Sequence, residues 1–463
     1  MTQIKFGTDG WRGLIAADFT FENVRRVALA TANYFKRHKK IKNGIVIGYD
    51  SRFLSREFAE ATAEVLANKG IKVIISDKIS STPMVSLLTT KFKAAGGVVI
   101  TASHNPAKYN GFKIKGEFGG PAHPEMIERV EKELKKVLKS KVESKKTFAE
   151  LVKKGTIKKL DFTSLYVEDL RTKLDLPLIE TSGLKIAHDA MYGAGQGVMS
   201  QLLPVRAEMR SSYNPSFGGG HPEPIPQNLK DLSSAVVMKG CDLGIATDGD
   251  ADRVGALDEN GAFVDSHRIF AILLKYLVKK HMKGEIAKSI SVSSMINKMC
   301  AKYGLKLRET PVGFKHLCRL MTERDILIAA EESGGLGLKG HLPERDGIYV
   351  GLLLAEVMAA RKRKLSELVE ELMIEFGWHY YNRIDAHLTE KEKQRILAAY
   401  KKGVKSLAGS PVQKVETGDG YKLFIEHGWV LVRASGTEPL IRFYAEADSA
   451  MRVDALLKAA TEV

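Results

Sequence analysis

Val98-Val99-Ile100-Thr101-Ala102-Ser103-His104-Asn105-Pro106 is a short apolar run that opens into a polar loop. The apolar residues are typical of a buried strand, and a proline cannot continue that strand. Small residues flank Ser103, and His104 and Asn105 offer side-chain donors. A serine hydroxyl is a poor nucleophile unless something activates it. Alone, these residues fit an ordinary polar loop better. The rest of the chain favours a serine that carries a phosphoryl group.

Two further stretches have the same form. The apolar run that ends at Thr247 opens into Asp248-Gly249-Asp250-Ala251-Asp252-Arg253, and the run Ile326–Ala330 opens into Glu331-Glu332-Ser333-Gly334-Gly335. In open α/β sheets, ligands bind beyond the carboxyl ends of the strands. Three such loops predict three α/β units that each present one loop to a shared cleft.

The acidic loop predicts a metal site. Asp248, Asp250 and Asp252 stand at alternate positions, and they converge only if the backbone curls. Clustered carboxylates repel one another unless a cation joins them, and oxygen ligands beside phosphate chemistry favour Mg²⁺. A calcium-binding helix-loop-helix loop is disfavoured because Arg253 stands where that loop needs glycine. Arg253 is instead suited to a bound phosphate.

A fourth loop has the composition of a phosphate clamp. Arg433-Ala434-Ser435-Gly436-Thr437-Glu438-Pro439 lies between two strand-like runs, Trp429–Val432 and Leu440–Tyr444. A guanidinium, two hydroxyl groups and a backbone that glycine allows to curl together favour phosphate binding.

These four loops together resemble the α-D-phosphohexomutase family, the phosphoglucomutases and phosphomannomutases. The resemblance covers essentially the whole chain in the family's order, from FGTDGWRG at residues 6–13 and TASHNPAKYNGFK at residues 101–113 onward. The probability that four motifs match in the family's order by chance is very small. The resemblance implies that Ser103 is a phosphoserine, and that Mg²⁺ is held by Asp248, Asp250, Asp252 and an oxygen of that phosphoserine.

The resemblance also implies the residues that bind substrate. They are the sugar-binding pair Glu331 and Ser333, the phosphate clamp Arg433, Ser435, Gly436 and Thr437, the turn from Thr310 to Gly313, and the cations Arg253, Arg345 and Arg442.

The proton-transfer groups are the least determined part of the site. Some members have histidine where this chain has Gly335, and animal-type members have a catalytic lysine where this chain has Arg345. Arginine is a poor proton carrier but a good charge stabiliser. Lys113 and His104 are therefore the expected catalytic acid and base, with Arg12 as a further catalytic cation.

The expected fold class is α/β, with three similar mixed-sheet α/β domains and a smaller C-terminal α+β domain around a central cleft. We place the phosphoserine loop in residues 1–156, the metal loop in 157–259, the sugar-binding loop in 260–374 and the phosphate-binding loop in 375–463. Among the expected elements is a helix from Glu390 to Leu407.

The composition agrees with a soluble enzyme. The 463 residues are 44% hydrophobic and 27% charged, which is ordinary for globular proteins. The three cysteines have no metal-ligand spacing and read as reduced thiols. The start of the chain lacks a signal-peptide layout, and the apolar stretch from Ile348 to Ala360 is too short to span a bilayer. We expect a cytoplasmic protein without a membrane partner, as a monomer or homodimer.

The formal net charge of +16 has two interpretations. It is typical of nucleic-acid binding, but the lysines are spread along the chain without interleaved aromatic residues for base stacking. A positive cleft would instead steer sugar phosphates inward. We expect small sugar phosphates and no nucleic acid as partners.

The expected reaction is reversible movement of a phosphoryl group between the 1- and 6-positions of glucose or mannose phosphate. It proceeds through phospho-Ser103 and a hexose 1,6-bisphosphate, which also serves as activator. The alternatives are a phosphoglucosamine mutase and a hexose 1,6-bisphosphate synthase. A phosphatase is disfavoured because its nucleophile would be an aspartate, and a binding protein with an inactive site is disfavoured because every chemical position is filled.

Overall fold

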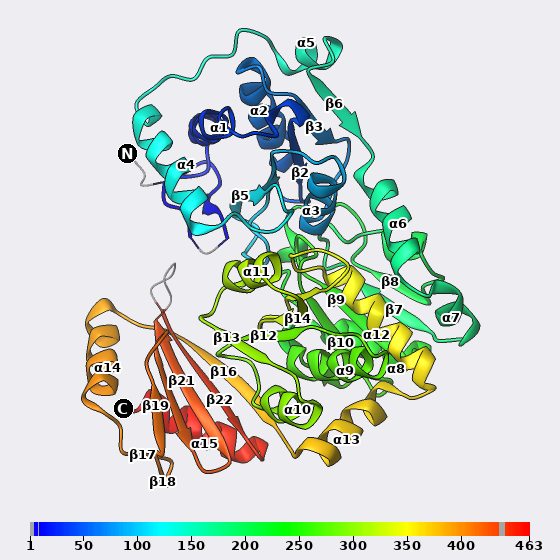
Figure 1. Ribbon diagram of the computed structural model, residues 1–463, viewed down its shortest axis with the longest axis vertical. Helices are drawn as coiled ribbons and strands as arrows, with labels where there is room; N and C mark the ends of the chain where they lie inside the picture. Colours follow the sequence, from blue (N-terminus) through cyan, green and yellow to red (C-terminus); the bar gives the residue numbers. More distant parts are fainter. Residues whose placement is uncertain (1–3, 8, 435–439) are drawn as a thin grey trace.

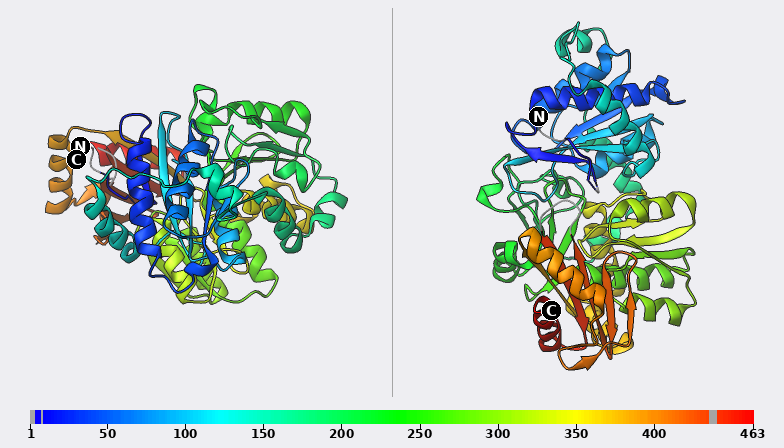
Figure 2. Two further views of the ribbon diagram at one scale, coloured as in Figure 1. Left: turned by 90° about the horizontal axis from the view of Figure 1, so that it is seen from above. Right: turned by 90° about the vertical axis from the view of Figure 1, so that its left-hand side faces the viewer.

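The computed structural model describes residues 4–7, 9–434 and 440–463, whose strands form three mixed sheets, one antiparallel sheet and a small two-stranded ribbon (Figure 1). Helices accompany all three mixed sheets, and the antiparallel sheet is formed by the last part of the chain. Figure 2 shows from the side that the N-terminal and C-terminal parts lie at opposite ends, and Figure 1 shows the middle of the chain beside the C-terminal part. The expected fold class is confirmed.

The first sheet has the strand order β1-β5-β4-β2-β3-β6, in which β5 pairs antiparallel with both β1 and β4 and the pairs among β4, β2, β3 and β6 are parallel. It reaches one strand beyond the boundary expected at residue 156, because β6 pairs with β3. Its elements are β1 (Trp11–Leu14), α1 (Phe21–Phe35), β2 (Ile45–Tyr49), α2 (Ser55–Asn68), β3 (Val73–Ser76), α3 (Thr82–Lys91), β4 (Gly96–Ile100), β5 (Tyr109–Gly116), α4 (Pro124–Val137), α5 (Phe148–Lys153) and β6 (Ile157–Leu160).

The second sheet has the order β11-β10-β9-β7-β8, in which β9, β7 and β8 are parallel. The antiparallel hairpin β9–β10 places the acidic loop at the carboxyl end of β9. The elements of this region are α6 (Phe162–Lys173), α7 (Leu176–Thr181), β7 (Ile186–Asp189), β8 (Ala207–Met209), α8 (Lys230–Lys239), β9 (Leu243–Thr247), β10 (Val254–Leu257) and β11 (Phe263–Val264).

The third sheet has the order β13-β12-β14-β15, with only β15 antiparallel. Its elements are α9 (Ser266–Lys279), β12 (Glu285–Ser289), α10 (Met295–Tyr303), β13 (Leu307–Thr310), α11 (Phe314–Glu323), β14 (Ile326–Ala330), β15 (Leu336–Leu338), α12 (Gly347–Arg361) and α13 (Leu365–Phe376).

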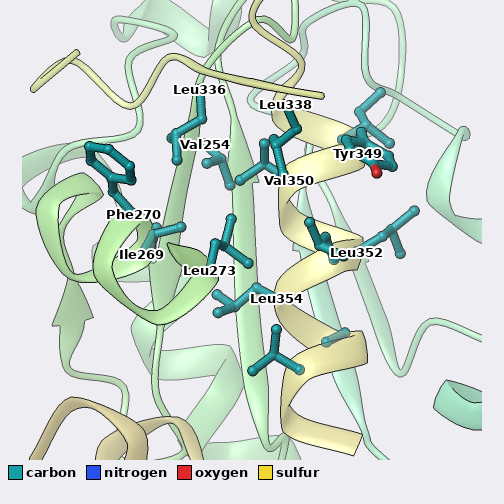
Figure 3. Packing of buried hydrophobic residues seen from close by; sticks show 14 of the residues in the cluster. Val254, Ile269, Phe270, Leu273, Leu336, Leu338, Tyr349, Val350, Leu352 and Leu354 are labelled. Carbon is teal, nitrogen blue, oxygen red and sulfur yellow. The ribbon is translucent and has the colours of Figure 1, made fainter. Parts of the chain in front are cut away.

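Helix α12 joins the cores of the second and third sheets. Figure 3 shows Val350 and Leu354 of α12 pointing toward Val254 of β10 and Leu273 of α9. The helix lies so close to β9 that a Cβ at Gly351 would stand 2.7 Å from Ile245 Cγ2. The apolar stretch from Ile348 to Ala360, which lies within this helix, is thus a core element. Within the described part of the chain, no helix is both long and apolar enough to cross a bilayer.

The fourth sheet is antiparallel, in the order β16-β22-β21-β20-β19, and α15 packs on it. The expected helix from Glu390 to Leu407 is wrong at its end: α14 stops at Lys402, because Gly403 adopts a positive φ of 102° and Leu407 pairs in β17. The elements are β16 (Tyr380–His387), α14 (Glu390–Lys402), β17 (Ser406–Leu407), β18 (Ser410–Pro411), β19 (Lys414–Glu416), β20 (Tyr421–Ile425), β21 (Gly428–Ala434), β22 (Leu440–Ala447) and α15 (Ala450–Thr461).

Candidate active site

Ser103 lies in the loop between β4 and β5, three residues after the strand ends. Its side chain is buried, and its Oγ donates to Asp248 Oδ2 over 2.8 Å. Its backbone has a φ of +54°, a left-handed conformation that residues with a Cβ seldom adopt. The loop of the first sheet therefore meets the acidic loop of the second sheet at the serine hydroxyl.

The three aspartates converge as expected. One carboxylate oxygen from each of Asp248, Asp250 and Asp252 lies within 4.8 Å of the others, and all three residues are buried. The loop approaches the serine loop so closely that a Cβ at Gly249 would stand 2.3 Å from the Ser103 carbonyl oxygen. Glycine is required there because any larger residue would separate the two loops.

The electrostatics of this cluster fit a divalent cation. Burial and the neighbouring Asp252 and Asp250 raise the pKa of Asp248 well above its usual range. Among the described residues, nothing donates a hydrogen bond to the buried Oδ1 atoms of Asp250 and Asp252. Buried carboxylate oxygens without donors are costly, and hard oxygen ligands are those that Mg²⁺ prefers. The donor set therefore fits Mg²⁺.

Lys113 of β5 faces the same carboxylates. Its Nζ lies 2.8 Å from Asp250 Oδ2, 3.2 Å from Asp252 Oδ2 and 2.8 Å from Asp9 Oδ2. Burial acts to lower the pKa of Lys113, but these carboxylates outweigh it and hold the pKa above its usual range. Lys113 is therefore a protonated ammonium.

The pKa of His104 is shifted in the opposite direction to that of Lys113. Burial, with help from Arg253 and Arg12, holds the pKa of His104 well below its usual range. Its Nδ1 is buried without a hydrogen-bond partner among the described residues. The imidazole is therefore neutral at pH 7.

Arg345 links the acidic cluster to the sugar-binding loop. Its Nη2 lies 2.7 Å from Asp9 Oδ2 and 2.6 Å from Asp252 Oδ2, and its Nη1 lies 4.0 Å from Glu331 Oε2. A Cβ at Gly335 would stand 2.3 Å from Arg345 Cδ. The glycine at this position leaves the space that Arg345 fills, and a histidine there would displace the arginine.

Two further arginines border the serine loop. Arg12 of β1 donates from Nη1 to Asn105 Oδ1 over 2.5 Å. Arg253 follows the acidic loop, and its Nη1 lies 3.3 Å from Glu223 Oε1. The structure brings both arginines to the side chains around Ser103, where they place positive charge.

Glu331 of the sugar-binding loop is buried and held by the turn that follows β13. Its Oε1 accepts from the backbone of Gly313 over 2.8 Å, and burial raises the pKa of Glu331 to about 7, against the opposing effect of Arg345. Thr310 ends β13, while Ser333 lies half-buried in the turn between β14 and β15.

The phosphate-binding loop is described only in part. Arg433 is the last residue but one of β21, and its Nε lies 2.8 Å from Asp419 Oδ2. The same carboxylate oxygen accepts from the backbone of Val312, so that it ties the fourth sheet to the turn after β13. Arg442 of β22 lies across the ladder from Arg433. Ser435, Gly436 and Thr437 lie outside the described residues.

Sequence reasoning missed several residues that the structure brings to the site. Asp9 stands in the first motif, but nothing in its spacing signals that it pairs with Lys113 and Arg345. Arg383 of β16 contributes positive charge to the surroundings of His104, and an isolated arginine in an edge strand carries no signal. Asp50 and Arg52 follow β2 and bind the serine loop: Arg52 donates to the carbonyl oxygen of Ser103, and Asp50 accepts from the hydroxyl of Thr101. Their position directly after a strand is the same signal that marks the three predicted loops.

Models of a known family match along the chain. They are those of phosphoglucomutase/phosphomannomutase: alpha/beta/alpha domain I at residues 3–141, domain II at 164–261, domain III at 265–376 and the C-terminal domain at 384–463.

Individual proteins match over nearly their whole lengths. A phosphoglucomutase/phosphomannomutase of Thermococcus kodakarensis is 32% identical, with 96% of this chain and 94% of that protein covered. A phosphoglucosamine mutase of Carboxydothermus hydrogenoformans is also 32% identical, with coverages of 96% and 95%. The crystal structure of a putative phosphomannomutase from Thermus thermophilus is 34% identical, with a TM-score of 0.87 over 99% of this chain and 98% of the other.

Proposed function

Because this chain belongs to the phosphoglucomutase/phosphomannomutase family, we propose that it moves a phosphoryl group reversibly between the 1- and 6-positions of glucose or mannose phosphate. The observation that carries the proposal is the buried hydroxyl of Ser103, 2.8 Å from Asp248 in a cluster of carboxylates, lysine and arginines. Phosphoryl transfer depends mainly on such positioning and charge stabilisation.

In the proposed reaction, phospho-Ser103 gives its phosphoryl group to the free hydroxyl of a bound hexose monophosphate. The serine oxygen takes up a proton, the hydroxyl loses one, and a hexose 1,6-bisphosphate results. That bisphosphate turns end for end, and Ser103 recovers the other phosphoryl group. Free hexose 1,6-bisphosphate also activates the enzyme, because it phosphorylates Ser103.

The residues divide this chemistry among them. We assign uptake of the attacking hydroxyl's proton to His104 and delivery of a proton to the serine oxygen to Lys113, which also stabilises negative charge. The directions of their pKa shifts support the starting forms, a neutral imidazole and a protonated ammonium. Asp248, Asp250 and Asp252, with an oxygen of phospho-Ser103, would hold Mg²⁺. The metal would supply charge neutralisation for the transferring group.

The remaining residues orient the sugar. The Glu331 carboxylate accepts hydrogen bonds from the sugar hydroxyls, and the Ser333 hydroxyl donates to them. The Gly313 turn fixes the Glu331 carboxylate. Substrate phosphates meet the cations of the site. These are Arg12 and Arg253 at the serine loop, Arg345 beside the sugar-binding loop, and Arg433, Arg442 and the 435–437 segment for the phosphate that does not react.

A second substrate class has equal support from the comparisons. A phosphoglucosamine mutase matches the chain at the same 32% identity as a phosphoglucomutase/phosphomannomutase. A coupled assay with glucose, mannose and glucosamine 1-phosphates, each with and without added hexose 1,6-bisphosphate, separates the two. Turnover of glucose or mannose 1-phosphate that bisphosphate stimulates supports the proposal. If glucosamine 1-phosphate is the one substrate of the three that turns over, the result contradicts the proposal and supports the second class. Net accumulation of bisphosphate indicates a synthase.

A further inference from the structure

Asp50 and Arg52 form a fully buried ion pair behind the Ser103 loop. They follow β2, and Arg52 Nε lies 3.0 Å from Asp50 Oδ2 with neither side chain exposed. Neither residue belongs to the proposed acid, base, metal or substrate groups. Burying two charges together is costly unless their remaining hydrogen bonds are satisfied. The partners of this pair therefore indicate what it holds in place.

Arg52 uses all its remaining donors on the serine loop. A guanidinium has five N–H groups in a fixed plane. Besides the bond to Asp50, Nη2 donates to the carbonyl oxygens of Ser103 and Asn105 over 2.5 and 2.6 Å. Nη1 donates to the carbonyl oxygens of Pro106 and Tyr109 over 2.9 and 3.0 Å. One side chain thus fixes four carbonyl groups of the loop.

Asp50 holds the other side of the same serine. Its Oδ2 accepts from the hydroxyl of Thr101 over 2.6 Å, and the Thr101 Oγ1 accepts from the backbone N–H of Ser103 over 2.8 Å. The C=O of Ser103 therefore accepts directly from Arg52, and its N–H is linked to Asp50 through the Thr101 hydroxyl. A left-handed residue other than glycine persists only where its surroundings over-determine it, and these bonds do so.

The pair also reaches the second domain. The Arg52 guanidinium lies 4.8 Å above the ring of Phe217, and the hydroxyl of Ser51 donates to the carbonyl oxygen of Tyr192 over 2.6 Å. The segment thus contacts the domain that carries the acidic loop, and it fixes Ser103 relative to that domain.

We infer that Asp50 and Arg52 are positioning residues that set the backbone of Ser103 for phosphoryl transfer. This inference rests on the proposed role of Ser103. The pair touches neither substrate nor metal. It orients the Ser103 hydroxyl toward Asp248 by fixing the peptide groups on both sides, so its loss acts on turnover rather than on substrate affinity.

The test compares Arg52→Ala and Arg52→Lys with Arg56→Ala in the full-length enzyme. Arg56 is a matched control because its exposed side chain pairs only with Glu60 among the described residues. A reacting group misplaced by about 1 Å can cost roughly 100-fold in rate. We expect a kcat loss of that order in both Arg52 variants with little change in KM, because lysine keeps the charge but not the planar set of donors. Arg56→Ala should keep the wild-type kcat.

Chemical rescue separates positioning from general stability. A cavity of about 570 Å³ adjoins Arg52, lined in part by Tyr49, Arg56 and Gln196. Guanidinium chloride, far below the molar concentrations that unfold proteins, should therefore enter and restore part of the kcat of Arg52→Ala. It should not raise the kcat of Arg56→Ala. Arg52 variants that melt at lower temperature but keep the wild-type kcat would overturn the inference.

Two substitutions of Thr101 test the inference if Arg52→Ala does not fold. Thr101→Val loses the bond to the Ser103 N–H, whereas Thr101→Ser keeps the hydroxyl. The inference expects a lower kcat for the valine variant than for the serine variant, and equal values would contradict it. Ser103→Ala distinguishes a failure of the proposed function from a failure of the positioning role: if that variant stays active, the proposed function fails. If it is inactive while the Arg52 variants keep full kcat, only the role of Arg52 fails.

Discussion

Lys115 of β5 and Glu344, in the segment before α12, form an ion pair in which neither side chain is exposed to solvent. The pair joins the first sheet to the third sheet. Glu344 also accepts from the backbone of Arg345 over 3.0 Å, so the pair supports the arginine that reaches Asp252. A buried carboxylate that loses its partner is strongly destabilising.

We therefore expect Lys115→Met to lower the free energy of unfolding by about 3–5 kcal/mol. The double variant with Glu344→Leu should recover part of that loss, because it removes a buried carboxylate that would be left with the longer contact to Arg345, 3.5 Å from Nε. Denaturant unfolding measures both. Lys141→Met breaks an ion pair in which both side chains are largely exposed and should leave stability unchanged; a loss as large as that of Lys115→Met would refute the explanation.

Mg²⁺ should stabilise the folded enzyme through the three aspartates. A ligand that binds only the folded state adds about 2.7 kcal/mol when its free concentration is 100 times its Kd. We expect the melting temperature to rise with Mg²⁺ and fall back with chelator, and activity to follow. In Asp250→Asn the rise should be much reduced. If the variant and the wild-type enzyme responded equally to Mg²⁺, the acidic loop would not be the metal site.

Activity should fall at acidic pH through Glu331. Burial raises the pKa of Glu331 to about 7, so its carboxylate is ionised above that pH and protonated below it. A protonated carboxyl group accepts hydrogen bonds from sugar hydroxyls less well. We expect kcat/KM to drop as the pH falls through about 7, and this dependence to be missing in Glu331→Gln. Titration of the substrate phosphate affects both enzymes alike, so the difference between their pH profiles isolates Glu331.

The same shift has an opposite effect on stability. Glu331 binds its proton more tightly in the folded state than at its ordinary pKa of 4.5. Stability attributable to this group therefore decreases as the pH rises from about 4.5 to about 7. A Glu331→Gln variant should lose this contribution, which is measured as a smaller change in melting temperature over that range.

Arg433 should matter to both halves of the reaction, because the phosphate that does not react occupies the same loop in either orientation. Arg433→Ala should cost about 2–4 kcal/mol of transition-state stabilisation, or roughly 30- to 1000-fold in kcat/KM. Arg433→Lys should recover only part, since it keeps the charge without the two-pronged donor set. Arg395→Ala, on the exposed side of α14, is the control. An Arg433→Ala enzyme with lower melting temperature but normal kcat/KM would make the residue merely structural.

The sequence predicted those parts of the site that follow directly from strand ends. Ser103, the three aspartates and Glu331 each come just after an apolar run; the structure brings the aspartates together and places Ser103 beside Asp248. Contacts between distant segments could not be predicted in this way. Asp9 and Arg345 meet across 336 positions, and Arg345 fits only because Gly335 leaves space for it. The end of α14 was also missed, because a lysine-rich helical pattern continues past the glycine that stops it.

The proposed reaction requires Ser103 to carry the phosphoryl group, and mass mapping in a single turnover follows that group. The enzyme is incubated with isotope-labelled hexose 1,6-bisphosphate, freed of it, and then mixed with an unlabelled hexose monophosphate while the peptide that contains Ser103 is followed. We expect one labelled phosphoryl group on Ser103, which leaves for the sugar at a rate no slower than kcat and is replaced by an unlabelled one, because Ser103 recovers the other phosphoryl group of the bisphosphate. A labelled phosphoryl group on another residue, or a label that stays on Ser103 while the enzyme turns over, would rule out this role of Ser103.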